Sequence, residues 1–253
     1  MNLAGTQLTP ASRRLWPHLA RHIKRTPPPT GADVLGAWFR GRHAHRQLRY
    51  DRTQRADAIV RRSDSLRDLS DANLNDSIVQ ARQAVLLGKD RDTAIDEAFA
   101  VTREVIRRVL GLSLYPEQVV GGLIMADGAC AEMATGEGKT VTAILPTALL
   151  GWSGRGVHVL TVNDYLASRD AEITGPVYRR LGMRVGVVVE STKQNDRRKA
   201  YDMDITYAAD KQVVFDYLRD RLYVPPAVSL SGTILESITG KGEAEWMSRA
   251  TWR

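Results

Sequence analysis

The sequence has one cysteine and no long apolar run. Because Cys130 stands alone among 253 residues, the chain forms no internal disulfide, and it offers no cysteine-based zinc site. There is no stretch of about 18 consecutive apolar residues, and the N-terminus lacks the apolar core of a secretion signal. We therefore expect no transmembrane helix and a reducing, cytosolic environment. Hydrophobic residues make up 43% of the chain and charged residues 26%, which is typical of a globular protein.

Acidic residues are scarce near the N-terminus. Residues 1–68 hold 14 Lys and Arg against 5 Asp and Glu, a net charge of +9, which leaves −2 for the rest because the total is +7. Such a segment suits an anionic phospholipid surface, with Trp38 and Phe39 dipping into the interface. A solvated basic tail and a nucleic-acid-binding arm remain alternatives, because the same charge serves all three.

Apolar periodicity predicts helices first and strands later. Residues 69–88 and 93–111 carry apolar side chains at helical spacing, with Ser70 or Asp71 as the first N-cap, and each segment ends on a glycine. Further along we expect strands over 129–134, 156–162, 184–190 and 204–209, and helices over 139–149, 163–181 with an interruption at Gly175 and Pro176, 197–202 and 212–222. β-Branched strands that alternate with helices predict an α/β fold with a parallel sheet covered on both faces.

A glycine-rich turn follows the first predicted strand. The phosphate-loop pattern G-x-x-x-x-G-K-[S/T] is met by Gly138, Lys139 and Thr140, but Met133 stands where the first glycine belongs. In such a loop, backbone N–H groups and the N-terminus of the next helix hold phosphate oxygens. The lysine reaches the β- and γ-phosphates, and the threonine hydroxyl binds Mg²⁺. From the pattern alone, a glycine turn that merely opens a helix is the alternative.

Longer phrases point to a family. The stretches "YPEQVVGGLIMADGACAEMATGEGKT", "GVHVLTVNDYLASRDAE" and "FDYLRDRL" resemble the first nucleotide-binding domain of SecA, the ATPase motor of bacterial preprotein secretion. The family departs from the strict phosphate loop in the same way, so Met133 does not count against ATP. The resemblance implies a RecA-like P-loop NTPase domain over 69–222. A basic extension over 1–68, helical or partly disordered, precedes it, and a divergent tail over 223–253 follows.

The resemblance also implies roles for individual residues. Gln118 would read adenine, because an amide presents both a donor and an acceptor, although its spacing alone favours a solvent-exposed side chain. Lys139 and Thr140 would be catalytic, and Thr140 would also be the Mg²⁺ ligand. The residues that bind ATP would be Gln118, Gly136, Glu137, Gly138, Lys139 and Thr140.

Two further segments of the resemblance carry a weaker assignment. Asp164 and Arg169, within "TVNDYLASRD", would couple the nucleotide state to neighbouring domains, or would simply begin a solvated helix. The family usually has Gly-Thr-Asn-Asn after the tyrosine of "DITY", where this sequence has Ala-Ala-Asp-Lys at 208–211. The role of that loop is therefore left open.

Parts of the family's motor are missing from the sequence. An apolar strand that ends in Asp-Glu, which would hold Mg²⁺ and activate water, does not follow "FDYLRD", and Glu236, Glu243 and Glu245 do not end such a strand. The second motor domain and its arginine are absent as well. We therefore expect a truncated fragment that binds ATP and hydrolyses it poorly by itself. The sequence leaves open whether its tail is genuine or arises from a frameshift.

The resemblance implies a SecA-type translocase subunit that couples ATP binding and hydrolysis to preprotein export through the SecYEG channel. It would be cytoplasmic and peripheral on the cytoplasmic face of the plasma membrane, and a homodimer is left open. One alternative is a helicase-like ATPase stimulated by nucleic acid, and another is a non-catalytic remnant that binds the membrane or the channel. The phrase "TVNDYLA" argues against nucleic acid, because helicase-like motors usually carry a proline-threonine motif at that place.

Overall fold

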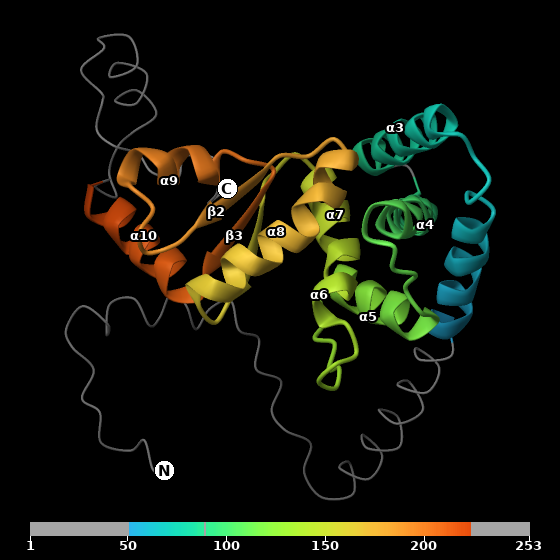
Figure 1. Cartoon of the computed structure of the whole chain (residues 1–253), viewed down its shortest axis with the longest axis horizontal. Coiled ribbons are helices and arrows are strands. Elements are labelled where there is room, and N and C mark those ends of the chain that lie inside the picture. Colours follow the sequence, from blue (N-terminus) through green and yellow to red (C-terminus); the bar gives the residue numbers. More distant parts are fainter. Residues whose placement is uncertain (1–50, 89, 224–253) are drawn as a thin grey trace, which may run out of the picture. The chain divides into compact units, whose positions relative to one another are not determined.

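The computed structural model describes residues 51–88 and 90–223, with side chains given up to residue 220. Trp38, Phe39, Glu236, Glu243 and Glu245 lie outside the described residues. Residues 51–64 are helical, and the next helices are α3 (Asp71–Leu87), α4 (Arg91–Leu110) and α5 (Pro116–Ala126). Two shorter helices, α6 (Lys139–Thr142) and α7 (Ile144–Trp152), precede the first strand of the sheet. Figure 1 shows these elements in chain order by colour.

The ends of α3 and α4 follow the predicted local signals. Ser70 is the N-cap of α3, where its hydroxyl accepts from the N–H of Asn73, and Gly88 ends the helix. Helix α4 begins at Arg91 with Asp90 as its N-cap, two residues earlier than the apolar pattern indicated, and ends at Gly111. The two amphipathic helices predicted over 69–88 and 93–111 are therefore confirmed.

The sheet of the described residues is parallel and has three strands, in the order β1-β3-β2. They are β1 (Val157–Thr161), β2 (Val185–Val188) and β3 (Ile205–Ala209). Helices α8 (Asp164–Arg180), α9 (Gln194–Tyr201) and α10 (Asp210–Tyr223) alternate with them. The parallel α/β architecture expected from the alternating pattern is confirmed.

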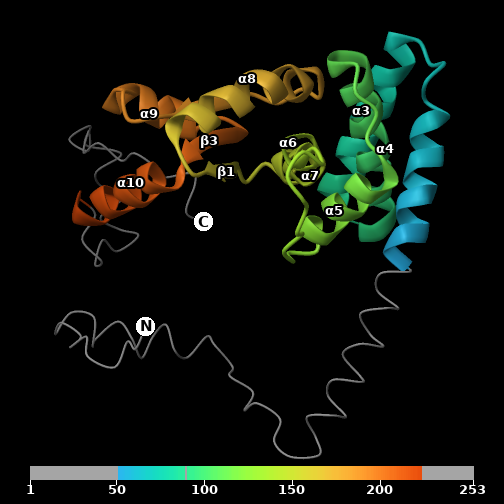
Figure 2. The ribbon, with the colours of Figure 1, turned by 60° about the horizontal axis from the view of Figure 1, so that its bottom comes forward.

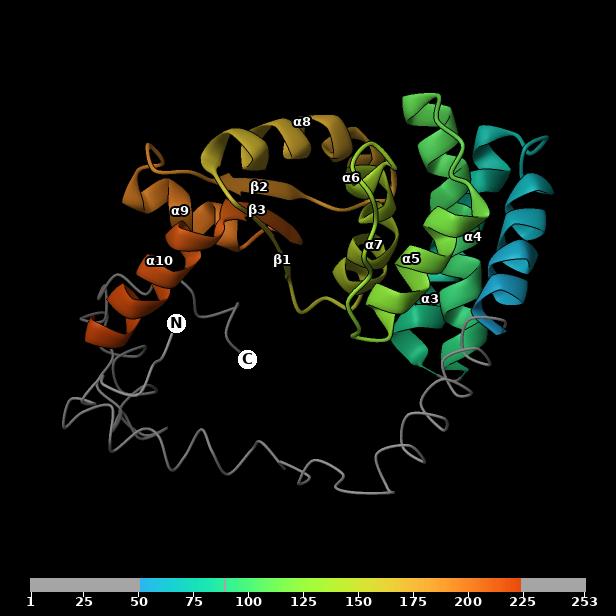
Figure 3. The same cartoon turned by 90° about the horizontal axis from the view of Figure 1, so that it is seen from below.

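Side chains on the two faces of β3 meet different helices. The Tyr207 hydroxyl lies 2.8 Å from the Thr174 hydroxyl of α8, whereas the Thr206 hydroxyl donates to the carbonyl of Ala200 on α9 at 2.8 Å. Ala208 shares a small apolar cluster with Val213 of α10. The sheet is therefore covered on both faces, and Figure 3 shows α8 on one side of the strands and α10 on the other.

Three details of the predicted elements are wrong. The stretch 129–134 forms no strand, because its alanines offer little of the β-branched packing that favours a strand and no described strand pairs with it. The helix expected over 139–149 breaks at Ala143 into α6 and α7. Conversely, α8 runs through Gly175 and Pro176 without interruption. Burial of Val177 and Tyr178 in the core offsets the hydrogen bond that the proline removes.

One hydrophobic core joins the helices to the sheet. It includes Phe99 of α4, Leu145 of α7 and Tyr207 of β3. Residues 51–64, which the sequence placed in the basic extension, contribute Ala56 and Ile59 to this same core. None of the described helices has the length and apolarity needed to cross a bilayer. The functional division into residues 1–68, 69–222 and 223–253 stays a prediction.

Close packing of β2 on α9 gives a first prediction. A Cβ on Gly186 would lie 2.5 Å from the backbone oxygen of Ala200, so we expect Gly186→Ala to lower the free energy of unfolding by about 2 kcal/mol through overpacking. Urea unfolding followed by circular dichroism measures this change. Gly175→Ala is the matched control, because a Cβ there meets only the flexible end of Arg179 at 3.1 Å, and the helix gains propensity. Equal destabilisation by both variants would contradict the overpacking argument.

Candidate functional site

A cavity of about 640 Å³ lies where the connection between α4 and α5 faces the glycine-rich loop before α6. Two segments of the chain form its wall. One comprises residues 112–115 and Gln118, and the other comprises Gly136, Glu137 and Gly138. The volume lies within the range of small-molecule sites, roughly 300–1,000 Å³. In Figure 2 the loop lies beside α5 and leads into α6.

The glycines allow the loop its shape. Gly136 has φ 90° and Gly138 has φ 81°, values in the left-handed region that L side chains avoid. A Cβ on Gly138 would also lie 2.5 Å from the Gln118 Nε2 atom. The loop therefore needs glycine at 138 for two reasons, the backbone conformation and the close approach of Gln118.

Several backbone N–H groups of the loop are unoccupied. Within the described part of the chain, the N–H groups of Gly136, Gly138, Lys139 and Thr140 donate no hydrogen bond. The Glu137 carboxylate accepts from the N–H of Ala134 at 2.9 Å, which closes the loop on itself. Consecutive free N–H groups in a glycine loop form an anion-binding concavity. Phosphate is therefore a chemically suitable ligand for this side of the cavity.

Gln118 joins the two walls of the cavity. Its Oε1 atom accepts from the N–H of Tyr115 at 2.9 Å, at the N-terminus of α5, and its Nε2 atom donates to the Glu137 carbonyl at 2.8 Å. An amide has two acceptor positions and two donor hydrogens. One acceptor and one donor therefore remain for a ligand, which is the pair that the edge of adenine requires.

Lys139 and Thr140 follow the loop directly, although neither is among the residues that line the cavity. Lys139 is exposed and, within the described residues, its ammonium group has no hydrogen-bond or ion-pair partner. Thr140 is half-buried in the single turn of α6. Because α6 has only four residues before the break at Ala143, the helix after the loop contributes less to the site than the predicted helix over 139–149 would.

Asp164, Arg169 and residues 208–211 also lie outside the cavity lining. The Asp164 carboxylate at the start of α8 accepts from the N–H of Glu190 at 2.6 Å, and Arg169 forms an ion pair with its neighbour Asp170 at 2.6 Å. Residues 208–211 form the junction between β3 and α10. These residues stabilise the region around the sheet, and coupling to other domains stays a prediction for Asp164 and Arg169.

Much of the basic charge over 51–68 is used within the fold. Within the described residues, three arginines of this segment form ion pairs with acids later in the chain: Arg52 with Asp127 at 2.8 Å, Arg55 with Asp96 at 2.5 Å and Arg62 with Glu97 at 2.7 Å. The sequence did not show these pairs. A contact between the extension and an anionic surface therefore depends chiefly on the charges of residues 1–50, which lie outside the described residues.

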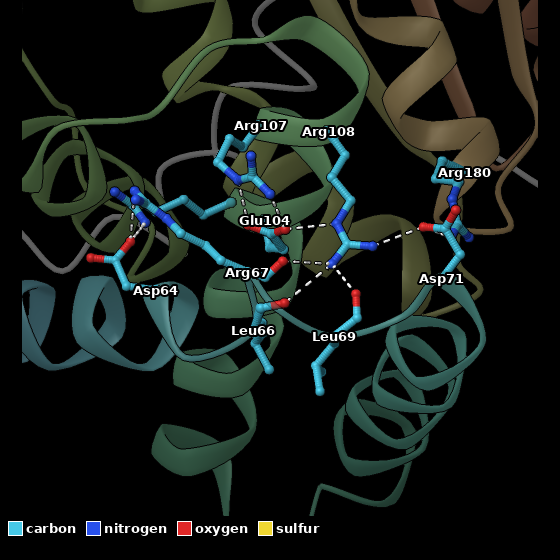
Figure 4. Close-up of polar contacts among 10 residues, drawn as sticks. Asp64, Leu66, Arg67, Leu69, Asp71, Glu104, Arg107, Arg108 and Arg180 are labelled. Atoms are coloured by element: carbon cyan, nitrogen blue, oxygen red, sulfur yellow. Dashed lines mark hydrogen bonds and ion pairs between the residues drawn. The ribbon is translucent and has the colours of Figure 1, made fainter.

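A second ion-pair cluster fastens the start of α3 to α4, as Figure 4 shows. The buried Glu104 carboxylate accepts from Arg107 at 2.7 Å and from Arg108 at 2.7 Å. Arg108 also donates to Asp71 and to the carbonyls of Leu66, Arg67 and Leu69. Burial pushes the pKa of Glu104 upward, but the hydrogen bonds and charges of the two arginines outweigh it and hold the pKa below its ordinary value.

The comparison with protein families agrees with this arrangement. The profile described as the SecA DEAD-like domain matches residues 37–235, most of the chain. The chain belongs to the SecA family. The resemblance noted in the sequence and the RecA-like α/β class are thereby confirmed, and the helicase-like alternative is not favoured.

Several proteins named protein translocase subunit SecA are similar to this chain. The one from Rubrobacter xylanophilus is 48% identical over 170 residues, which are 67% of this chain and 19% of that relative. The one from Acidithiobacillus ferrooxidans is 46% identical over 178 residues, 69% and 20% respectively. The one from Myxococcus xanthus is 50% identical over 157 residues, 62% and 17%. This chain thus spans about a fifth of the length of the SecA relatives it matches.

Some cavity residues were not predicted. Met133 was considered only as a departure from the phosphate-loop pattern, yet it lines the cavity, as do Leu112 and Tyr115. The signal that could have found Tyr115 is its place three residues before Gln118 on the same N-terminal turn. Arg103, whose guanidinium donates to the carbonyl of the lining residue Leu114 at 3.0 Å, carries no local signal in the sequence.

Proposed function

We propose that this chain binds ATP in the cavity between the α4–α5 connection and the loop over 136–138, as the ATP-binding part of a SecA-type translocase. The observation that supports this most directly is the contact of Gln118 with the loop at Gly138, because both residues line the cavity. It brings a donor–acceptor amide suited to a base next to free N–H groups suited to phosphate. The family assignment, made independently of this geometry, implies the same ligand.

Different residues around the cavity would bind the base and the phosphates of ATP. The Tyr115 side chain is 70% exposed at the cavity and offers a ring face for stacking on the base. The remaining donor and acceptor of Gln118 select adenine. The N–H groups of the loop hold phosphate oxygens, and the free ammonium of Lys139 reaches the terminal phosphates.

A magnesium ion fits this site only in company with ATP. The described residues hold no cluster of three His, Cys, Asp or Glu side chains that would bind a metal on its own. Of the predicted residues, the Thr140 hydroxyl would hold Mg²⁺ together with the phosphate oxygens. When bound, the ion would neutralise charge on the phosphates. The acidic motif that assists it in complete motors is not found in the sequence, which supports poor hydrolysis by this chain alone.

The partners proposed for the chain are those of a translocase motor. They are a preprotein, the SecYEG channel and, through residues 1–68, an anionic phospholipid surface on the cytoplasmic face of the plasma membrane. The relatives' name, protein translocase subunit SecA, supports protein transport, and the net charge of +9 over 1–68, most of it in residues 1–50, supports the lipid surface. Because the chain covers about a fifth of each relative's length, its part in translocation belongs to the proposal.

Calorimetry and ATPase assays together test the proposal. We expect heat on titration with ATP and a tighter dissociation constant when Mg²⁺ is present. Thr140→Val should lose the effect of Mg²⁺, whereas Thr140→Ser keeps the hydroxyl and should retain it. Hydrolysis should be slow, and preprotein with SecYEG vesicles should stimulate it more than RNA does. Absence of ATP binding at millimolar concentration, or stimulation by RNA alone, would refute the proposal.

A further inference from the structure

One buried side chain, Arg103 of α4, connects the N-terminal helix to the wall of the cavity. Arg103 is 6% exposed. Its Nη1 atom donates to the Asp64 carboxylate at 2.9 Å, at the end of the helix over 51–64. Its Nε atom donates to the Leu114 carbonyl at 3.0 Å, and Leu114 lines the cavity. Arg103 itself is not among the lining residues, so it acts on the cavity only through another group.

That group is the peptide between Leu114 and Tyr115, which is held at both polar ends. Its carbonyl accepts from Arg103, and its N–H donates to the Oε1 atom of Gln118 at 2.9 Å. Because a peptide unit is planar, the orientation that Arg103 gives the carbonyl also sets the direction of the N–H. The direction of the N–H in turn decides where the Gln118 amide lies.

The hydrogen bonds continue into the phosphate loop, since Gln118 Nε2 donates to the Glu137 carbonyl at 2.8 Å. A chain of hydrogen bonds therefore runs from Asp64 through Arg103, the peptide and Gln118 to the loop. Bonds in such a chain polarise one another, so that removal of an early member weakens the later ones. A substitution of Arg103 should therefore affect Gln118, the residue proposed to bind the base, more than the rest of the cavity.

We propose that Arg103 is a positioning residue that sets adenine selectivity by orienting Gln118 through the Leu114–Tyr115 peptide. The inference rests on the proposed function, because it concerns the same nucleotide site. An amide in the wrong orientation no longer presents its free donor and acceptor to adenine. ATP binding then weakens while GTP binding, which does not use this pair, changes little. An arginine that only stabilised the fold would weaken the binding of both nucleotides alike.

Arg197 offers a matched control for the loss of a buried guanidinium. It is also 6% exposed, it donates to the carboxylate of Asp216, and it donates to the carbonyls of Val189 and Glu190. None of these residues lines the cavity. Arg197→Lys should therefore lower the melting temperature and leave nucleotide selectivity unchanged.

The experiment measures, in the 253-residue chain, the ratio of the dissociation constants of GTP and ATP, together with the melting temperature. In Arg103→Lys a single ammonium cannot hold both partners of the planar guanidinium, so we expect the ratio to fall about three- to tenfold, the effect of roughly one hydrogen bond. Asp64→Asn keeps the guanidinium but removes its charged partner. It should lower the ratio by a smaller factor.

The outcomes separate this inference from the proposed function. If the unchanged chain prefers ATP and the ratio falls in Arg103→Lys but not in Arg197→Lys, the inference is supported. If the unchanged chain prefers ATP and both Arg103→Lys and Asp64→Asn keep the ratio, the inference is overturned while the proposed function stands. Should Arg103→Lys fail to fold, Asp64→Asn alone decides by the same criterion. If the unchanged chain binds ATP and GTP equally, or binds neither, base recognition by Gln118 is refuted, and the inference about Arg103 is refuted as well.

Discussion

Lys139→Ala is expected to weaken ATP binding by about ten- to hundredfold, the loss that follows removal of a charged hydrogen-bond donor. The ammonium group of Lys139 has no competing partner within the described residues, so its full charge is available to the ligand. It follows directly on the free N–H groups of the loop, which share the same phosphates. Calorimetric titration with ATP measures the change. The melting temperature should stay close to that of the unchanged chain, because the side chain is exposed.

Lys193→Ala is the matched control for this loss of charge. Lys193 is likewise exposed, but it precedes α9 and does not line the cavity. We expect no more than about a twofold change in the ATP dissociation constant, since exposed charges at a distance are screened by salt. If Lys139→Ala bound ATP as tightly as Lys193→Ala does, the phosphates would not lie where the loop is proposed to hold them.

Local signals predicted most of the elements of this fold. Ser70 and Gly88 mark the ends of α3 because a cap depends only on the few residues around it. The buried strand β3 was recognised from its own apolar side chains. The sequence did not predict the break at Ala143, and it predicted a strand over 129–134 that the structure does not have. Each depends on what packs or pairs with the segment, and neighbours distant in the sequence decide this.

The candidate site divides in the same way. Gly138, Lys139 and Thr140 were found from their spacing, since the phosphate loop is a local motif. The approach of Gln118 to Gly138 requires the tertiary fold, because 20 positions separate the two residues in the sequence. Arg103 was missed for the same reason: its partner Asp64 lies 39 residues away. Charge pairs between distant segments leave no periodic pattern in a sequence.

The ion pairs around Glu104 carry the largest expected effect on stability. Glu104 is 1% exposed and accepts from two arginines. Glu104→Gln therefore removes this anion from Arg107 and leaves Arg108 with the exposed carboxylate of Asp71. We expect the free energy of unfolding to fall by about 3 kcal/mol, the lower end of the cost of breaking a buried pair, because Arg107 and Arg108 keep some contact with water. Arg108 also holds the carbonyls of residues 66, 67 and 69, so the connection before α3 should loosen.

Glu97 offers a matched control for the loss of Glu104, because it pairs with an arginine on the surface. Glu97→Gln removes the exposed pair between Glu97 and Arg62, whose side chains are 30% and 49% exposed, and should lower the free energy of unfolding by less than about 1 kcal/mol.

The arginines lower the pKa of Glu104 in the folded state. The contribution of Glu104 to the free energy of unfolding is therefore present above the ordinary pKa of 4.5 and is lost as the pH falls through the lower folded-state pKa. The difference between the unchanged chain and Glu104→Gln should therefore be constant near neutral pH and shrink in acid. Urea unfolding at a series of pH values measures it, and a difference that grew in acid would contradict the assignment of the charge to Glu104.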